Sequence, residues 1–155
     1  MVFYFTASTG HLIYMGRDKF ENEDLIKYHW AEDIWFHVDD LSSAHVYLRY
    51  PVPGTKHKPI TDLKEIPEEL VAECCQLVKA NSIEGCKKHS VKVVITFAAN
   101  LRKEASMKTG QVGYKDKKLV MHTSVDKEKA IVKALEKTRK ELFVGLALQC
   151  ASFSY

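Results

Sequence analysis

Apolar and polar residues alternate along two stretches in the middle of the chain, 33–39 and 45–49. Successive side chains of a strand point to opposite faces, so this spacing of two predicts two half-buried strands. The apolar positions share one face: Ile34, Phe36, Val38, Val46 and Leu48. The other face carries the remaining, mostly polar side chains: Asp33, Trp35, His37, Asp39, His45, Tyr47 and Arg49. The rest of the chain is organised around this pair.

The two strands predict a specific antiparallel register if the chain turns back about Leu41. The residues that then face each other form three pairs: Asp33 with Arg49, Trp35 with Tyr47, and His37 with His45. A charge pair, an aromatic pair and a histidine pair in one row are cross-strand matches that stabilise sheets.

This row of polar and aromatic residues has two interpretations. It is either a half-buried face covered by a helix, with its polar groups satisfied internally, or an open platform. On such a platform a nucleic-acid base would stack against Trp35 beside Arg49. Aromatic and charged residues often lie on structural faces, so the pattern alone favours the covered face.

Shorter patterns predict the elements before this pair. The apolar runs Val2–Thr6 and Leu12–Gly16 are separated by a turn sequence and predict a hairpin. Asn22 is a good N-cap and predicts a helix to about His29, with Leu25 turned inward.

The second half of the chain predicts two longer helices and further strands. Pro67 begins a helix whose inward stripe is Leu70, Val71, Cys74, Leu77 and Val78. The β-branched run Val91–Phe97 predicts an inner strand, and Gln111–Tyr114 and Lys118–His122 predict two more. Ser124 is expected to cap a final helix with the stripe Ile131, Ala134, Leu135, Thr138 and Leu142.

These elements predict one α+β domain without internal repeats or linkers. We expect a mixed, mostly antiparallel sheet with about three helices packed on it, spanning residues 1–141, and an atypical apolar tail over 142–155. The segment Pro51–Pro59 contains three prolines and a glycine and predicts an exposed loop.

Composition agrees with one globular domain, because 155 residues with 46% hydrophobic content can bury a core. The sequence has no secretory leader and no run of about 20 apolar residues, so we expect no transmembrane segment. Cys74, Cys75, Cys86 and Cys150 lack the spacing of zinc or redox motifs. Reduced thiols and a cytoplasmic or nuclear location follow as expectations.

Charge is unevenly distributed, although the net charge is only +3. Residues 18–73 contain 13 acidic and 6 basic residues, whereas residues 79–118 contain 3 acidic and 10 basic residues. Such asymmetry indicates an anionic partner, such as nucleic acid or a membrane surface, or two halves that attract each other in the fold.

Two catalytic alternatives are weaker. A metal site could use His37 and His45 with Asp39 or Asp33, but no metalloenzyme signature surrounds them. A nucleophile could be Ser42 or Ser43 beside His45, but the Gly-x-Ser-x-Gly elbow is absent. No Walker loop or dinucleotide fingerprint occurs. We therefore expect no enzyme, no catalytic residues, no metal and no cofactor.

Several short motifs occur in a fixed order along the chain. They are Gly16-Arg17-Asp18-Lys19 with Asn22, Asp33-Ile-Trp-Phe-His37, Ala44-His45-Val-Tyr-Leu-Arg49, Ala80-Asn81-Ser82, Val91–Thr96, Asn100-Leu-Arg-Lys103 and Gly110-Gln-Val-Gly-Tyr114. In these motifs and their order the chain resembles the NFACT-R domain family over roughly residues 2–124.

The resemblance implies an RNA-binding module without catalysis of its own. Larger members of the family are ribosome-associated quality-control factors that bind tRNA and the large ribosomal subunit, and a stand-alone animal member is linked to DNA recognition. The chain departs from the family pattern at Pro51–Thr61, a longer connection, and over 142–155, where apolar residues replace a charged coiled coil. It also lacks the larger factors' N-terminal domain, so nascent-chain tailing is not expected.

The sequence thus predicts a nucleic-acid-binding module, with RNA preferred over DNA and the ribosome as a further partner implied by the family. The phosphates of the ligand would contact the basic residues of 79–118, and side chains of the row in 33–49 would stack on its bases and orient them. By motif position the expected contact residues are Arg17, Lys19, Asp33, Trp35, His37, His45, Arg49, Asn100, Arg102 and Lys103. The alternatives are a DNA-binding receptor-type domain, a protein-docking module on a ribosomal or membrane partner, and a metal-dependent hydrolase.

Overall fold

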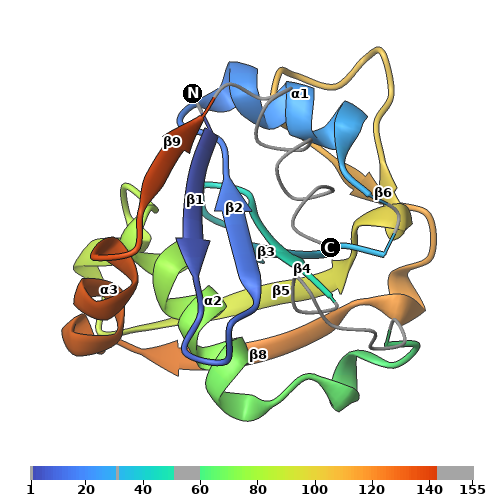
Figure 1. Cartoon of the computed structure of the whole chain (residues 1–155). Coiled ribbons are helices and arrows are strands. Elements are labelled where there is room, and N and C mark those ends of the chain that lie inside the picture. The colour runs from blue at the N-terminus through green and yellow to red at the C-terminus, as the bar shows by residue number, and fades with distance from the viewer. Residues whose placement is uncertain (1, 31, 51–59, 143–155) are drawn as a thin grey trace.

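A single antiparallel sheet forms the centre of the molecule (Figure 1). The computed structural model describes residues 2–30, 32–50 and 60–142. The sheet has the strand order β8-β5-β3-β4-β2-β1-β9, and β6 and β7 form a separate small sheet. The strands are β1 Val2–Thr6, β2 Leu12–Met15, β3 Ile34–Val38, β4 Val46–Arg49, β5 Ser90–Phe97, β6 Leu101–Arg102, β7 Gly113–Tyr114, β8 Met121–Asp126 and β9 Lys140–Leu142.

Three α-helices flank the sheet in the described part of the chain, as the α+β prediction requires. They are α1 Lys19–Tyr28, α2 Glu68–Ala80 and α3 Lys129–Glu136. Short 3-10 turns cover Leu63–Glu65, Gly85–Lys87, Ala98–Asn100 and Lys117–Leu119. Within the described ranges, no helix is both long and apolar enough to cross a bilayer.

The sheet separates two apolar cores because its strands alternate. Ile34 and Phe36 belong to the larger core, which α2 closes with residues such as Leu70. Trp35 points to the opposite face and joins a second core that includes Leu25 of α1. One strand therefore contributes to both cores, and the row predicted from the sequence lies on the α1 side.

The predicted register of the central strands is confirmed. Trp35 lies opposite Tyr47, and the flanking pairs are Ile34 with Leu48 and Phe36 with Val46. The same register brings the two histidine rings within 5.0 Å, centroid to centroid. The hairpin of β1 and β2 and the inner position of β5 are confirmed as well.

Helix α1 begins earlier than predicted, so the assignment of its N-cap to Asn22 is wrong. The cap is Asp18, whose carboxylate accepts hydrogen bonds from the backbone N–H groups of Phe20 and Glu21 at 3.1 and 3.0 Å. Asn22 lies inside the helix and is buried. Both residue types can cap a helix, so residue type alone does not locate the first turn.

The final helix is shorter than predicted, and Ser124 does not cap it. Ser124 lies in β8, opposite Lys92 of β5. The helix ends where Thr138 Oγ1 donates to the Leu135 carbonyl at 2.7 Å and accepts from Thr6 N–H at 3.0 Å. The chain then runs beside β1 as β9 (Figure 1). A side chain that bonds locally to the backbone competes with helix continuation, which sequence periodicity does not detect.

Four other predictions differ from the structure or concern residues outside the described ranges. The strand expected at Gln111–Tyr114 is confined to Gly113–Tyr114, and that at Lys118–His122 begins at Met121 after a 3-10 turn. The predicted loop Pro51–Pro59 and all of the apolar tail except Leu142 lie outside the described residues.

Replacing Leu135 with alanine should destabilise the domain by about 2–5 kcal/mol, because it is the buried residue of α3 and its loss leaves a cavity. Urea unfolding measures the change. The neighbouring Ala134→Ser variant, on the exposed side of the helix, should stay within about 0.5 kcal/mol of the parent. Equal stability of the two variants would contradict the placement of α3.

Candidate nucleic-acid interface

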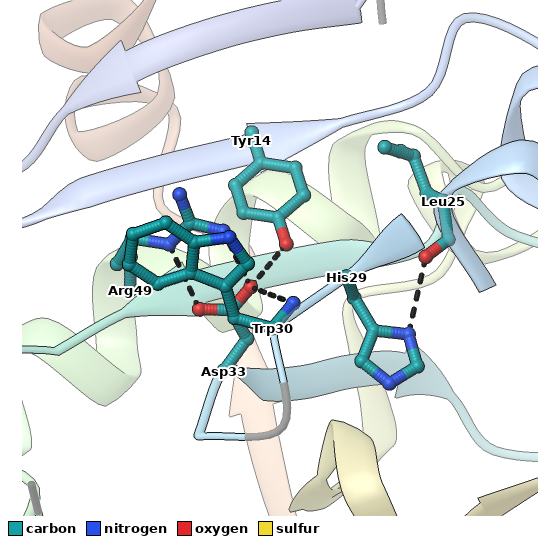
Figure 2. A network of polar contacts seen from close by, with 6 residues as sticks. All are labelled: Tyr14, Leu25, His29, Trp30, Asp33 and Arg49. Atoms are coloured by element: carbon teal, nitrogen blue, oxygen red, sulfur yellow. Dashed lines mark hydrogen bonds and ion pairs between the residues drawn. The ribbon is translucent and has the colours of Figure 1, made fainter. Parts of the chain in front are cut away.

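A fully buried ion pair joins the ends of β3 and β4 (Figure 2). Arg49 Nε and Nη2 donate to the two oxygens of the Asp33 carboxylate at 3.0 and 2.9 Å. Tyr14 Oη and the backbone N–H of Trp30 donate to the same carboxylate. Bidentate geometry and further donors are the conditions under which a buried charge pair is tolerated.

Aromatic rings enclose this ion pair. The guanidinium carbon of Arg49 lies 3.6 Å from the centre of the Trp30 ring and 5.3 Å from that of Tyr14. Burial and the neighbouring Asp33 carboxylate raise the pKa of Tyr14 well above its usual value, so its hydroxyl remains a donor. Asp33 and Arg49 therefore stabilise the strand register from inside the protein.

The indole of Trp35 lies beneath other side chains, with 1% of its surface exposed. Its Nε1–H donates to His45 Nδ1 at 3.0 Å. His37 stacks on it with ring centroids 5.4 Å apart and planes at 16°, and Tyr114 approaches edge-on at 6.0 Å. For this ring the open-platform interpretation is wrong and the covered-face interpretation, which the pattern alone favours, is confirmed, because segments distant in sequence cover it.

His45 connects the sheet to the segment that follows β6. An indole N–H can only donate, so Nδ1 of His45 is unprotonated and Nε2 carries the proton. The ring also forms a hydrogen bond with the Gly110 backbone. Burial, together with the neighbouring His37, lowers the pKa of His45 to about 3, so the imidazole is neutral near pH 7.

A cavity of about 610 Å³ opens beside these rings. Trp35, His37 and His45 line its inner side. The turn after β3, with Asp39 and Asp40, forms one wall, and residues 108–112 with Tyr114 form another. Asp40 has φ of 60°, a left-handed conformation that Asp tolerates better than most residues. The cavity therefore combines aromatic rings, carboxylates and a basic segment.

His37 is the half-buried ring between Trp35 and the cavity. Its Nδ1–H donates to the Val38 carbonyl at 2.6 Å, which fixes the orientation of the ring. Burial lowers the pKa of His37, while the Val38 carbonyl and Asp39 raise it to a smaller extent. The ring is therefore neutral at physiological pH.

Glu23 of α1 attaches the basic segment to the body of the domain. Its carboxylate contacts Lys103 Nζ at 2.7 Å and accepts from the Gly110 N–H at 3.3 Å. Lys103 Nζ also donates to the carbonyls of Lys108 and Gln111 at 2.6 and 2.8 Å. Gly110 has φ of 83°, and a Cβ there would lie 3.3 Å from Lys19 Cβ. Glycine at this position satisfies both constraints.

The residues predicted to bind nucleic acid divide into three groups. The first group lies at the cavity or its basic wall and consists of Trp35, His37, His45, Lys19 and Lys103. The second group is buried and consists of Asp33, Arg49 and Asn100. The Asn100 side chain holds the turn after β7, because it donates to the Asp116 carbonyl and accepts from the Asp116 N–H. Arg17 and Arg102 are exposed beside Asp18 and Glu104, at 3.8 and 3.1 Å. The direct contact predicted for Asp33, Trp35 and Arg49 requires exposure that these side chains do not have.

The cavity residues that sequence reasoning did not single out include Lys108, Gln111 and Tyr114. Gln111 and Tyr114 belong to the motif Gly110-Gln-Val-Gly-Tyr114, so a signal was present. The spacing of one segment cannot show which face of a sheet it covers.

The residues of the two catalytic alternatives have other roles in the structure. Ser43 Oγ accepts from Val38 N–H at 3.1 Å and donates to the Ala44 carbonyl at 3.0 Å, so it supports the turn. Asp33 is engaged by Arg49. In the part of the chain that the structure describes, no three His, Cys, Asp or Glu side chains are grouped as metal ligands.

A family model described as the NFACT protein RNA binding domain matches residues 1–116. The chain belongs to the NFACT-R family. The resemblance expected from the motifs is confirmed, and the family is described as an RNA-binding domain rather than as an enzyme.

Several relatives match more than nine tenths of this chain and about 70% of their own length. Coiled-coil domain-containing protein 25 of Danio rerio is 52% identical over 153 residues, covering 96% of this chain and 70% of the relative. The Dictyostelium discoideum homolog is 51% identical, covering 94% and 68%. Protein JLP2 of Saccharomyces cerevisiae is 38% identical, covering 92% and 70%. The opening Met1-Val-Phe-Tyr-Phe-Thr and the run Glu21-Asn-Glu-Asp-Leu-Ile-Lys predict a likeness to coiled-coil domain-containing protein 25, and these matches confirm it.

A solved structure supports the fold of the NFACT-R domain. The C-terminal part of the fibronectin/fibrinogen-binding protein from Streptococcus suis superposes with a TM-score of 0.69. The match covers 85% of this chain and 47% of that chain at 19% identity. At this identity the likeness concerns the fold alone.

Replacing Asp33 with asparagine in the NFACT-R domain should cost about 3–5 kcal/mol, because Arg49 would remain buried without its counter-charge. Denaturant unfolding measures the loss. The control Asp126→Asn, at an exposed carboxylate, should have little effect. A double variant Asp33→Leu with Arg49→Met should be more stable than Asp33→Asn. If Asp33→Asn is as stable as the parent, the ion pair does not support the register.

The NFACT-R domain should lose stability as pH falls below about 6.5. His45 has a folded-state pKa of about 3 against about 6.5 unfolded, so the unfolded state binds the extra proton between these values. The contribution is complete above pH 6.5 and falls by about 1.4 kcal/mol per pH unit below it. His45→Gln should flatten the pH profile of urea unfolding, whereas the exposed control His89→Gln should not.

Proposed function

We propose that this NFACT-R domain is a non-enzymatic module that binds nucleic acid, with RNA as the preferred ligand. The observation that carries the proposal is the position of the basic segment 102–118. Its residues 108–112 and Tyr114, including the exposed Lys108, form a wall of the cavity whose inner side is made by Trp35, His37 and His45. The family description as an RNA-binding domain supports the same ligand class.

The basic segment supplies the positive charge that a phosphate backbone requires. Residues 102–118 contain six basic and two acidic side chains. Five of the basic side chains are exposed: Arg102, Lys108, Lys115, Lys117 and Lys118. Lys103 is the exception, because Glu23 and two carbonyls hold it. Phosphate contacts would therefore come from the five exposed cations, and Lys103 would maintain the shape of the segment.

The partners and location that we propose are those implied by the family. tRNA and ribosomal RNA are the proposed partners, in the cytoplasm or nucleus, as in the larger ribosome-associated members. DNA is the alternative ligand suggested by the stand-alone animal relative. A third possibility, docking on a ribosomal or membrane protein, depends on residues 142–155, most of which lie outside the described residues.

The chemistry of the site supports binding without catalysis. His45 donates and accepts within the protein and is neutral, so it has little capacity to move a proton to a ligand. Ser43 is used in the turn. The groups that could act on RNA are thus engaged in holding the cavity together.

Neutralising Lys115, Lys117 and Lys118 with glutamine should weaken RNA binding and reduce its salt dependence. Each lost phosphate contact on a single strand lowers the slope of log K against log salt by about 0.7, so the three together lower it by about 2. Fluorescence anisotropy with a single-stranded RNA between 50 and 200 mM salt measures both effects.

The matched control replaces three exposed lysines at and after α3: Lys129, Lys133 and Lys137. It removes the same charge and should leave the slope unchanged. If both triple variants weaken binding equally, net charge alone attracts RNA and the 102–118 surface is not the site. If the parent domain binds neither RNA nor DNA at 50 mM salt, the proposed function is wrong.

A further inference from the structure

We infer that the cavity beside His37 receives a single unpaired nucleobase bearing an exocyclic amino group, with the RNA backbone passing outside over the basic segment. The inference rests on the proposed function and narrows it. The ligand class becomes single-stranded or bulged RNA with cytosine or adenine at one position, rather than duplex RNA of any sequence.

The cavity has the size and shape for one base and its sugar. Its volume of about 610 Å³ lies within the range of small-molecule sites. A base inside a duplex is stacked on both faces and paired along its Watson–Crick edge, so it cannot enter such a cavity without leaving the helix. An unpaired base avoids most of that cost.

The inner side of the cavity offers a stacking surface that is already formed. Trp35 covers one face of the His37 ring at 16° between planes, and the bond to the Val38 carbonyl fixes the ring. Tyr114 borders the same space. A base can therefore stack on a ring that loses little conformational freedom, which favours affinity.

The charges around the cavity favour a base over a phosphate in its interior. Asp39 and Asp40 form one wall, and the neutral His37 and His45 do not offset them. A phosphate placed there would be repelled by the two carboxylates. Asp39 is half-buried, and its backbone N–H donates to Lys92 O at 2.8 Å. Its carboxylate Oδ2 lies 3.9 Å from His122 Nε2. A carboxylate in this position can accept from the amino group of a base, as Asp and Glu do with cytosine N4.

The wall formed by residues 108–112 suits the backbone of the same nucleotide. Lys108 lies at the rim of the cavity and is exposed. Glu23 holds this wall through Gly110 and Lys103. The base would therefore enter between the acidic wall and His37, while its phosphate lies against the basic wall.

The experiment compares three RNAs by fluorescence anisotropy at one salt concentration. They are a blunt hairpin and two otherwise identical hairpins with one bulged nucleotide, either cytosine or uracil. We expect the bulged cytosine to bind about tenfold more tightly than uracil or the blunt hairpin. Asp39→Asn should remove the preference for cytosine over uracil, and His37→Ala should remove the advantage of the bulge over the blunt hairpin.

Matched controls are Asp126→Asn and His89→Ala, both exposed and outside the cavity, and both should behave as the parent. A fourth RNA with bulged 2-aminopurine reports stacking directly, because its fluorescence should be quenched in the parent and recover in His37→Ala. Equal, salt-dependent binding of all hairpins would overturn the cavity inference while leaving the proposed function standing. Absence of binding to every RNA would refute both.

Discussion

The buried ion pair between Asp33 and Arg49 is the constraint on which the functional surface depends. Charges removed from water are tolerated only in a geometry that pairs them, and a shift of one residue between β3 and β4 would leave both unpaired. The pair therefore selects one register. That register sets the two histidines next to each other and directs Trp35 toward α1. A charge interaction at one end of the strands thus determines the chemistry at the other.

Two sets of polar contacts fix the basic segment 102–118 against the sheet and α1. His45 joins the Trp35 indole to the backbone of Gly110, and Glu23 joins α1 to Gly110 and Lys103. The segment 102–118 has little regular structure, only the two-residue strands β6 and β7 and one turn. Its shape consequently depends on these links rather than on a ladder of backbone bonds, and the cavity wall is fixed where the two links meet.

The register was predictable because it depends on residues that are close in sequence and match across the strands. The segments that cover Trp35 were not predictable. They are Tyr114 and α1, and nothing within residues 33–49 specifies that they pack there. The same limit explains the C-terminal error. The helical spacing from Ile131 to Leu142 is real, but Thr138 bonds to the strand β1, a partner 132 residues away, and ends the helix.

Burial of the predicted contact residues changes their role rather than removing it. An exposed indole would bind any base by stacking and could not discriminate well. A buried indole instead immobilises the ring above it: Trp35 supports His37 on one face and orients His45 by a hydrogen bond. In the proposed complex, the surface that meets the ligand is a second layer of His37, Tyr114, Asp39 and Lys108, whose hydrogen-bonding groups are directional. A rigid layer with acceptors and donors at fixed positions can distinguish one base from another, which a bare aromatic platform cannot do.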